Sequence, residues 1–422
     1  MGLRRLALAA LLTALPLGVV ASERAVAPGP DALSLAIASA LPGDVLVLGP
    51  GDYAGPVTID RSLTIEGAGA TVTGSGTGSV VLIDAPGVTI RGLGVTGSGA
   101  KLEDLDSGIF LTASADGAII EGNRLERNLI GINVHGAANV IVRGNDILGR
   151  NDLRVPERGP GVYVWNAPNL LVEDNAIRRG RDGIFISSSS KATYRGNDLS
   201  ELRYAFHSMY ANDIQVEGNV SRGNDLGFAF MYSTRVTAVG NLSEGDVTHG
   251  FFMNFANRST LIGNEVRDGG EKCLFIYNSN RNFYEGNRLE GCDIGVHFTA
   301  GSEGNVMSGN AFINNRTQVK YVGTRWLEWS QDGRGNYWSD HAGFDIDGDG
   351  TLDSPYRPND VIDKLIWSQP MVRLLTGAPA MQLVSWSQAR FPGLTPGGVV
   401  DSYPMASPAQ AGLVSVLEGD TQ

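Results

Sequence analysis

Cysteine, basic residues and long hydrophobic runs are all scarce in this 422-residue chain. Only two cysteines occur, so the chain is not a disulfide scaffold. Lysine and arginine number 33 against 45 aspartates and glutamates, which gives a net charge of −12. This balance argues against a nucleic-acid partner, because phosphates require basic patches. Only the N-terminus carries an apolar run that approaches the length of a membrane span.

That N-terminal run has the pattern of a secretory signal. Two arginines precede an alanine- and leucine-rich run from Leu6 to Val20, and a Val19-x-Ala21 step closes it. Residues 1–21 are therefore predicted to be a signal peptide that is cleaved near Ala21. The alternative is a retained membrane anchor, although the run is short for one. We expect the mature protein outside the cytoplasm, in the periplasm of a Gram-negative cell.

Glycine is abundant, with 56 residues, and asparagine recurs at a near-constant spacing between Gly108 and Asn310. Each of nine asparagines closes a short apolar run, and the gaps between them are 22 or 23 residues apart from a single gap of 30. The nine are Asn123, Asn145, Asn175, Asn197, Asn219, Asn241, Asn264, Asn287 and Asn310. A fixed period in this range predicts a solenoid.

Each repeat holds two or three short runs of alternating apolar residues, and none holds a stretch with helical spacing. We therefore expect an all-β fold, with one repeat forming one coil of a parallel β-helix and coils stacked about 4.8 Å apart. The asparagines are predicted to be structural, because Asn tolerates left-handed backbone angles and stacked amides can hydrogen-bond between coils. The eight-residue excess, within 151–159, is predicted to be a loop.

The spacing divides the chain into a β-helix over 22–324, an aromatic and acidic segment over 325–357, and a C-terminal segment over 358–422. A short amphipathic helix over 31–41 is expected to cover the first coil. Residues 361–375 and 380–391 are each expected to form an amphipathic helix, and the end from Thr395 is expected to be extended or loose.

One set of strands is predicted to carry unusual residues on its outer side. If the small residue that opens each run is position zero, positions one and three point inward and positions two and four point outward. Position two reads Phe110, Asn133, Tyr163, Phe185, His207, Ala229, Phe252, Phe275 and His297. Position four reads Thr112, His135, Trp165, Ser187, Met209, Met231, Asn254, Tyr277 and Thr299. Aromatics, histidines and methionines thus replace the Thr, Lys and Glu expected of an exposed sheet.

Three of these outward residues form a candidate metal site. His207 and Met209 lie two residues apart on one strand, and Met231 falls over Met209 on the next coil. Imidazole and thioether donors suit Cu(I) and suit hard cations poorly. The alternative is an apolar patch for a protein partner, in which methionine fills gaps. His135 and His297 are three and four coils away from His207, too far to join the same ion.

The aromatic residues of the same columns are predicted to face a partner. This surface comprises Trp165, Phe185, Phe252, Phe275 and Tyr277.

β-Helix enzymes that act on acidic sugars use clustered carboxylates or a basic residue with Ca²⁺. The outward columns hold no carboxylate, so we predict no catalytic residue, with a secreted uronan lyase or hydrolase and a non-catalytic interaction scaffold as the alternatives.

An acidic motif over 345–353 resembles the opening of a Ca²⁺ loop. Asp345, Asp347 and Asp349 alternate before Gly350, and Asp353 follows. The pattern predicts a structural Ca²⁺ site formed by these four carboxylates. The twelfth position is tyrosine rather than glutamate, so an acidic turn without a metal is the alternative.

The two cysteines leave their pairing open. Cys273 occupies position zero of its coil, whereas Cys292 lies three residues before the equivalent place on the next coil. Along a strand this offset is about 10 Å, beyond the reach of a disulfide unless the turn folds back.

The chain resembles the NosD-type periplasmic copper-binding proteins, accessory factors in nitrous oxide reductase maturation. The resemblance covers nearly the whole length, through Gly335-Asn-Tyr-Trp-Ser-Asp340 and, most specifically, the tail from Ala378 to Asp401. It implies a right-handed, pectin-lyase-like β-helix and a role in copper delivery for denitrification. It also implies an ABC transporter permease and ATPase as partners, with nitrous oxide reductase and other copper chaperones as further partners. Residues 358–410 are then expected to dock on the permease.

Overall fold

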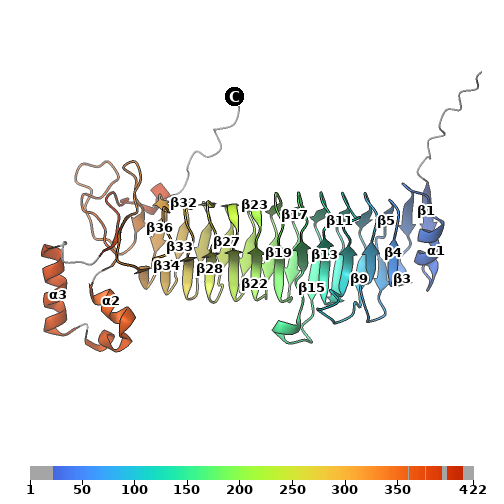
Figure 1. Ribbon diagram of the computed structural model, residues 1–422, viewed down its shortest axis with the longest axis horizontal. Coiled ribbons are helices and arrows are strands. Elements are labelled where there is room, and N and C mark those ends of the chain that lie inside the picture. The colour runs from blue at the N-terminus through green and yellow to red at the C-terminus, as the bar shows by residue number, and fades with distance from the viewer. Residues whose placement is uncertain (1–21, 360, 376, 392–396, 412–422) are drawn as a thin grey trace, which may run out of the picture.

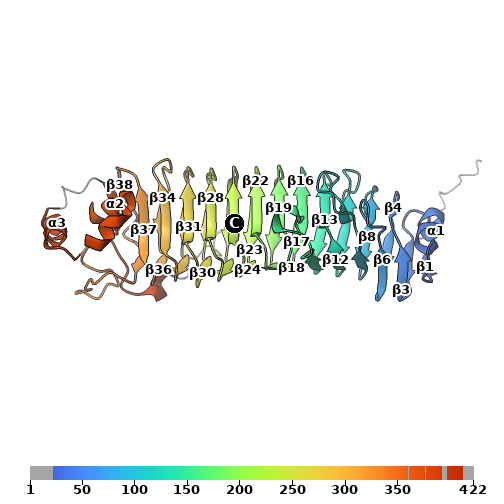
Figure 2. The ribbon, with the colours of Figure 1, turned by 90° about the horizontal axis from the view of Figure 1, so that it is seen from below.

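The computed structural model describes residues 22–359, 361–375, 377–391 and 397–411, so the predicted signal peptide lies outside the described residues. The chain forms a right-handed parallel β-helix, a straight rod of stacked coils (Figures 1 and 2). Each coil contributes one strand to each of three long sheets. The predicted all-β solenoid with a few short helices is confirmed.

The first sheet has 13 parallel strands. They are β1 (Glu23–Val26), β2 (Val45–Leu48), β5 (Thr64–Glu66), β8 (Thr89–Arg91), β11 (Ile119–Glu121), β14 (Ile141–Arg143), β17 (Leu171–Glu173), β20 (Thr193–Arg195), β23 (Asn212–Glu217), β26 (Thr234–Val239), β29 (Thr260–Ile262), β32 (Phe283–Glu285) and β35 (Val306–Ser308). The central residue of each three-residue strand is buried, which leaves its two neighbours on the outer side.

The second sheet also has 13 strands. They are β3 (Gly51–Ala54), β6 (Ala70–Thr73), β9 (Gly94–Thr96), β12 (Arg124–Asn128), β15 (Asp146–Gly149), β18 (Ala176–Arg178), β21 (Asp198–Ser200), β24 (Val220–Arg222), β27 (Leu242–Glu244), β30 (Glu265–Arg267), β33 (Arg288–Glu290), β36 (Ala311–Ile313) and β39 (Tyr337–Trp338). The 151–159 insertion leaves this sheet after β15 as a projecting loop with one turn of 3-10 helix, η1 (Val155–Glu157), as predicted (Figure 1).

The third sheet has 12 strands and carries the columns singled out in the sequence. They are β4 (Val57–Ile59), β7 (Val81–Ile83), β10 (Ser107–Leu111), β13 (Ile130–His135), β16 (Val162–Trp165), β19 (Asp182–Ser187), β22 (Tyr204–Met209), β25 (Leu226–Met231), β28 (His249–Asn254), β31 (Lys272–Tyr277), β34 (Ile294–Thr299) and β37 (Thr317–Val322). From β19 onwards all seven of these strands are six residues long, so they present more side chains than most of their counterparts in the other sheets.

The nine asparagines form the predicted ladder. Each side-chain Nδ2 donates to the Oδ1 of the next asparagine at 2.8 to 3.0 Å, and all nine are buried. The sequence pattern ends at Asn310, but the ladder continues for one more rung to Asn336. The left-handed residue of each turn is the one before the asparagine, such as Gly218 with φ 59°, so the ladder depends on amide hydrogen bonds and not on the asparagine backbone.

The N-terminal end of the rod is covered by α1 (Ala32–Ser39), as predicted (Figure 1). Leu33 and Ile37 of α1 are buried against the first coils. Asp44 joins this end to β1, because its carboxylate accepts hydrogen bonds from the backbone N–H groups of Leu41 and Ser22. The edge of the stack is thereby shielded from pairing with another chain.

Cys273 and Cys292 form a disulfide, with their Cα atoms 5.7 Å apart. The straight-strand offset from the sequence does not apply, because Cys292 lies in the turn between β33 and β34 and this turn folds back over Cys273. The bridge has room because residue 269 is glycine: a Cβ there would lie 2.2 Å from the Cys292 sulfur.

The C-terminal end is built from segments that are far apart in the sequence. β38 (Trp326–Glu328) pairs with β40 (Gly398–Val400), and β39 extends the second sheet. The Asp401 carboxylate is fully buried and accepts hydrogen bonds from Asn336 N and Trp338 Nε1 at 2.7 and 2.8 Å. The end from Thr395 is expected from the sequence to be extended or loose; β40 is extended, but it is paired with β38, and Asp401 holds the last rung of the asparagine ladder.

Beyond this junction lie α2 (Val361–Ser368), a 3-10 turn η2 (Pro370–Leu375) and α3 (Pro379–Arg390) at the far end of the rod (Figure 1). The two predicted C-terminal helices are confirmed, except that the first ends at Ser368 and continues as η2. A last 3-10 turn, η4 (Pro408–Ala411), contacts β39.

Candidate metal site and partner surface

In β22 and β25 of the third sheet, the predicted inward and outward directions of the side chains are confirmed. Phe206, Phe228 and Phe230 occupy positions one and three and are fully buried in the interior. Met209 and Met231 occupy position four, are partly exposed, and are directly paired across the two strands. The two thioether side chains therefore lie on the outer side of adjacent coils, about 4.8 Å apart at the backbone.

His207 lies on the same side of β22, but it is more enclosed than a surface histidine. Only 7% of the surface of this residue is exposed to solvent. The ring lies against Phe185, with centroids 4.8 Å apart, and makes an edge-to-face contact with the Tyr204 ring, with centroids 4.6 Å apart. Nδ1 lies 3.4 Å from a carboxylate oxygen of Asp182, whereas Nε2 is buried and has no hydrogen-bond partner among the described residues.

Asp182 adds a buried negative charge beside His207. Its carboxylate is completely buried and accepts two hydrogen bonds from the Arg203 guanidinium, at 2.9 and 2.8 Å. Burial raises the pKa of the Asp182 carboxyl, but the hydrogen bonds from His207 and Arg203 outweigh burial, so the pKa lies below its usual range. Asp182 is thus a carboxylate under ordinary conditions. The repeat pattern of the sequence does not single out Asp182, because this residue precedes position zero.

Ala229 interrupts the column of rings in position two. On one side of Ala229 the column continues with His207 and Phe185, and on the other side with Phe252 and Phe275. Ala229 is thus the only small side chain between these rings, and it lies on the same strand as Met231. Ala229 is itself fully covered by its neighbours. The gap in the column coincides with the methionine pair.

The other histidines of the third sheet are not brought to this site. His135 stacks between Trp165 and Phe110, with ring centroids 4.2 and 5.7 Å away. His297 stacks on Phe275 at 4.6 Å, and burial, aided by repulsion from Lys320, lowers its pKa to about 4. As predicted, they lie three and four coils from His207.

The predicted partner surface divides into exposed and half-buried residues. Trp165 and Tyr277 are 37% and 41% exposed. Phe185, Phe252 and Phe275 lie in ring stacks and are only partly exposed, with Phe252 and Phe275 5.0 Å apart and nearly parallel.

A second aromatic column, which was not predicted from the sequence, lies in the turn after position four. Tyr210, Tyr232 and Phe255 are exposed and stack at 5.2 and 5.1 Å on three successive coils. All three have left-handed backbones, with φ between 50° and 54°. This conformation costs roughly 1–2 kcal/mol for a residue with a Cβ. The three rings immediately follow Met209, Met231 and Asn254, so they extend the aromatic surface beside the methionine pair. Their spacing of 22 and 23 residues was the available signal.

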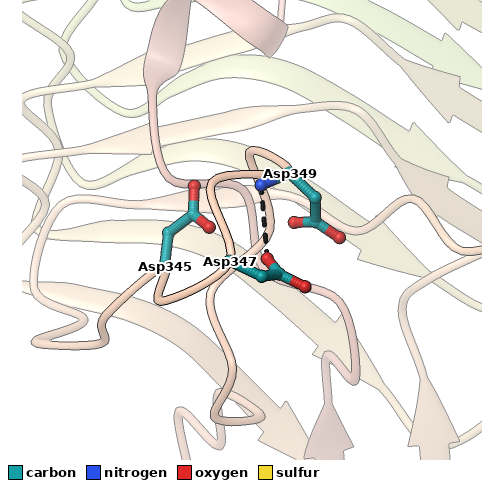
Figure 3. A group of neighbouring side chains, drawn as sticks. All are labelled: Asp345, Asp347 and Asp349. Atoms are coloured by element: carbon teal, nitrogen blue, oxygen red, sulfur yellow. Dashed lines mark hydrogen bonds between the residues drawn. The ribbon is translucent and has the colours of Figure 1, made fainter.

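The acidic loop brings together three of its four predicted carboxylates. Asp345, Asp347 and Asp349 each offer an oxygen within 4.8 Å of the others, and their side chains face a common space (Figure 3). The Asp345 carboxylate also accepts hydrogen bonds from the backbone N–H groups of Gly348 and Gly350. Asp353 is not in this group; its carboxylate accepts a hydrogen bond from Ile346 N at 2.8 Å.

The C-terminal helices expose an unusual amount of apolar surface. Met371, Leu374 and Leu375 of η2 are 57% to 79% exposed. Leu383 and Trp386 of α3 and the following Phe391 are 57% to 63% exposed. Exposed large apolar side chains mark interaction sites where they gather on one surface. Within the described part of the chain, no helix is both long and apolar enough to cross a membrane.

The fold is a pectin-lyase-like parallel β-helix, and one of its outer faces carries stacked aromatic rings, histidines and a methionine pair. Among solved structures, the chain is similar to a family 28 exopolygalacturonase from Yersinia enterocolitica, with a TM-score of 0.52 and 13% identity over 74% of this chain and 75% of that chain. This likeness shows the fold alone.

The particular family follows from closer relatives. The chain is 41% identical to a probable ABC transporter binding protein NosD of Stutzerimonas stutzeri, over 84% of this chain and 85% of the relative. It is also 41% identical to the NosD of Pseudomonas aeruginosa, over 85% and 87% of the two chains. Residues 142–343 match the family model described as periplasmic copper-binding protein (NosD). The chain belongs to the NosD family and is a periplasmic protein.

Proposed function

We propose that this protein is a copper-handling accessory protein that receives or hands on Cu(I) in the periplasm and works with an ABC transporter to mature the copper sites of nitrous oxide reductase. Its relatives are named as ABC transporter binding proteins, and its family is described as copper-binding. In this role it binds its cargo and its partners and performs no catalysis of its own.

The observation that carries the proposal is the placement of His207, Met209 and Met231. The methionines are paired across β22 and β25 on the outer side, and His207 lies on the same side of β22. Two thioethers and one imidazole form a soft donor set that suits Cu(I) and discriminates against Ca²⁺ and Mg²⁺. The unpartnered Nε2 of His207 fits this role, because a buried imidazole nitrogen without a hydrogen bond is otherwise costly.

Transporter docking is assigned to the C-terminal helices. α3, which carries exposed apolar side chains together with the preceding η2, lies at the end of the rod, far from β22 (Figure 1). One end can therefore contact the permease of the transporter while the side of the rod remains open to nitrous oxide reductase or a copper chaperone. Trp165, Tyr277 and the rings between them supply the second contact surface.

The acidic loop is assigned a structural Ca²⁺. Oxygen ligands from Asp345, Asp347 and Asp349 suit a hard cation. In this role the ion would hold the loop on the closing segment of the rod. We expect Ca²⁺ to raise the melting temperature of the wild type and to have no effect on the Asp345→Asn/Asp347→Asn variant. An equal increase in both proteins would contradict the site.

The copper site is tested by competition for Cu(I) against a colorimetric chelator, with the mature, untagged protein under anaerobic conditions. Met209→Leu/Met231→Leu is expected to lower the affinity at least about 100-fold, because both sulfur donors are lost while volume is kept. The matched control is Met371→Leu, which removes an exposed methionine at the far end. If the double variant bound Cu(I) as tightly as the wild type, the proposed copper site would be wrong. Release of uronic acid from polygalacturonate by the wild type would instead support the alternative function as a carbohydrate-active enzyme.

Docking is tested by co-purification with the membrane complex. Leu374→Glu places a charge among the exposed apolar side chains of η2 and is expected to abolish co-purification. Leu35→Glu changes an equally apolar exposed position on α1, at the opposite end of the rod, and should leave it intact. Equal recovery of the two variants would contradict docking through η2 and α3.

A further inference from the structure

Of the four histidines on the third sheet, His207 differs from the others in its partner. Nδ1 of His135, of His249 and of His297 is buried and has no hydrogen-bond partner among the described residues. Nδ1 of His207 lies 3.4 Å from the Asp182 carboxylate. Only this imidazole is therefore held by an acidic group.

The position of Asp182 follows from the coil register. Asp182 begins β19 and pairs with Tyr204 of β22, so the following coil brings Arg203 and His207 to either side of it. Arg203 occupies both carboxylate oxygens, and one of them is shared with His207. The guanidinium also lies over the Tyr204 ring, 4.5 Å from its centroid.

Stabilisation of the fold alone does not explain why a carboxylate is buried at position 182. A buried charge carries a large desolvation cost, and a buried ion pair seldom stabilises a fold more than apolar residues of the same volume would. In other coils the same place is filled without a carboxylate, by Tyr204, Leu226 and His249. The carboxylate is present one coil below His207.

The contact determines which nitrogen of His207 carries the proton. A carboxylate is only an acceptor, so Nδ1 must donate its hydrogen to Asp182. In the neutral ring Nε2 then has a free lone pair, which is the form that binds a metal. The Phe185 and Tyr204 rings restrict rotation of the imidazole about its bond to Cβ.

We propose that Asp182 is a positioning residue for copper binding: it fixes the tautomer and orientation of His207 so that Nε2 is presented to the ion. This inference rests on the proposed copper function. Metal-bound histidines commonly donate their other ring N–H to a carboxylate, and losing that partner costs about 10- to 100-fold in metal affinity. Asp182 itself does not contact the ion.

The first measurement needs no copper. In metal-free wild type with ¹⁵N-labelled histidine at about pH 8, where a free imidazole is neutral, NMR is expected to show His207 with its proton on Nδ1. The His207→Gln variant assigns the signal. A proton on Nε2 would overturn the proposal, and this result is independent of how any variant at position 182 folds.

The second measurement is a cycle of Cu(I) affinities. Asp182→Asn is expected to lower the affinity about 10- to 100-fold in the wild type and to leave it unchanged in the His207→Gln background. The matched control is Asp198→Asn, which removes an exposed carboxylate paired with Arg222 and should keep wild-type affinity. Equal losses in both backgrounds would show a merely structural effect of Asp182 and would overturn the proposal.

The two proposals fail in different ways. Wild-type affinity in Met209→Leu/Met231→Leu overturns the copper site and with it the role given to Asp182. A strong loss in that variant, together with unchanged affinity in Asp182→Asn, overturns only the role of Asp182.

Discussion

The three outer faces of the rod differ in kind although the coils behind them are alike. On the first and second sheets, acidic and basic side chains alternate from coil to coil, as in Glu121 with Arg91 and Arg143, or Arg222 with Asp198 and Glu244. On the third sheet, the columns from Phe110 to Thr299 carry rings, histidines and methionines and no carboxylate. Exposed ion pairs keep a surface solvated, whereas half-exposed stacked rings favour contact with a partner. Interior packing therefore defines the fold, and only one of the three faces is specialised.

The largest expected effect comes from breaking what all three faces share, the ladder inside the turns. Asn219→Ala removes hydrogen bonds with Asn197, Asn241 and Tyr194 O and leaves buried polar groups unpaired. We expect it to lower the free energy of unfolding by about 3–5 kcal/mol, because each unpaired buried group costs about 1–3 kcal/mol. Denaturant unfolding measures this, and a loss below about 1 kcal/mol would mean that the ladder is dispensable.

The next effect concerns acid. His297 is half-buried in the ring column, and burial lowers its pKa to about 4 from the ordinary 6.5. As the pH falls from 6.5 towards 4, the unfolded chain takes up a proton that the folded protein does not, so stability is lost across that window. In His297→Gln, the free energy of unfolding should fall by roughly 2 kcal/mol less than in the wild type over this pH range. The check is unfolding of both proteins at several pH values, and parallel curves would contradict it.

A smaller effect is expected from the exposed rings of the third face. Trp165→Ala removes a stack on His135 with centroids 4.2 Å apart. The expected loss is about 1 kcal/mol of stability, within the range for aromatic pairs. Trp165→Phe keeps a ring and should recover most of it. If Trp165 also faces a partner, the alanine variant will lose binding to nitrous oxide reductase or a chaperone more than it loses stability.

The sequence predicted the fold well because every coil repeats the same local solution. The asparagine period predicted the ladder, and strand alternation placed His207, Met209 and Met231 on one side of adjacent coils. It missed what depends on contacts across the repeat. Asp182 lies outside the counted positions, and Asp401 reaches Asn336 from 65 residues away. The Cys273–Cys292 bridge stayed an open alternative because the sequence does not show whether the turn folds back. The period of the sequence shows which side of a strand each side chain lies on. The geometry of a turn and the closing of the C-terminal end of the rod depend on packing in three dimensions.

The smallest effect should come from the charged faces, and it sharpens the comparison most directly. Arg222 follows Asn219 by three residues on the same coil, but its side chain is 47% exposed and its guanidinium pairs with Asp198 and Glu244. Arg222→Ala is expected to change the free energy of unfolding by less than about 0.5 kcal/mol, because water and salt screen exposed pairs. At roughly 1 M salt even that difference should vanish, since the screening length falls to about 3 Å. A loss as large as that of Asn219→Ala would show that the charged rungs hold the coils together, and the contrast between a solvated face and a contact face would then fail.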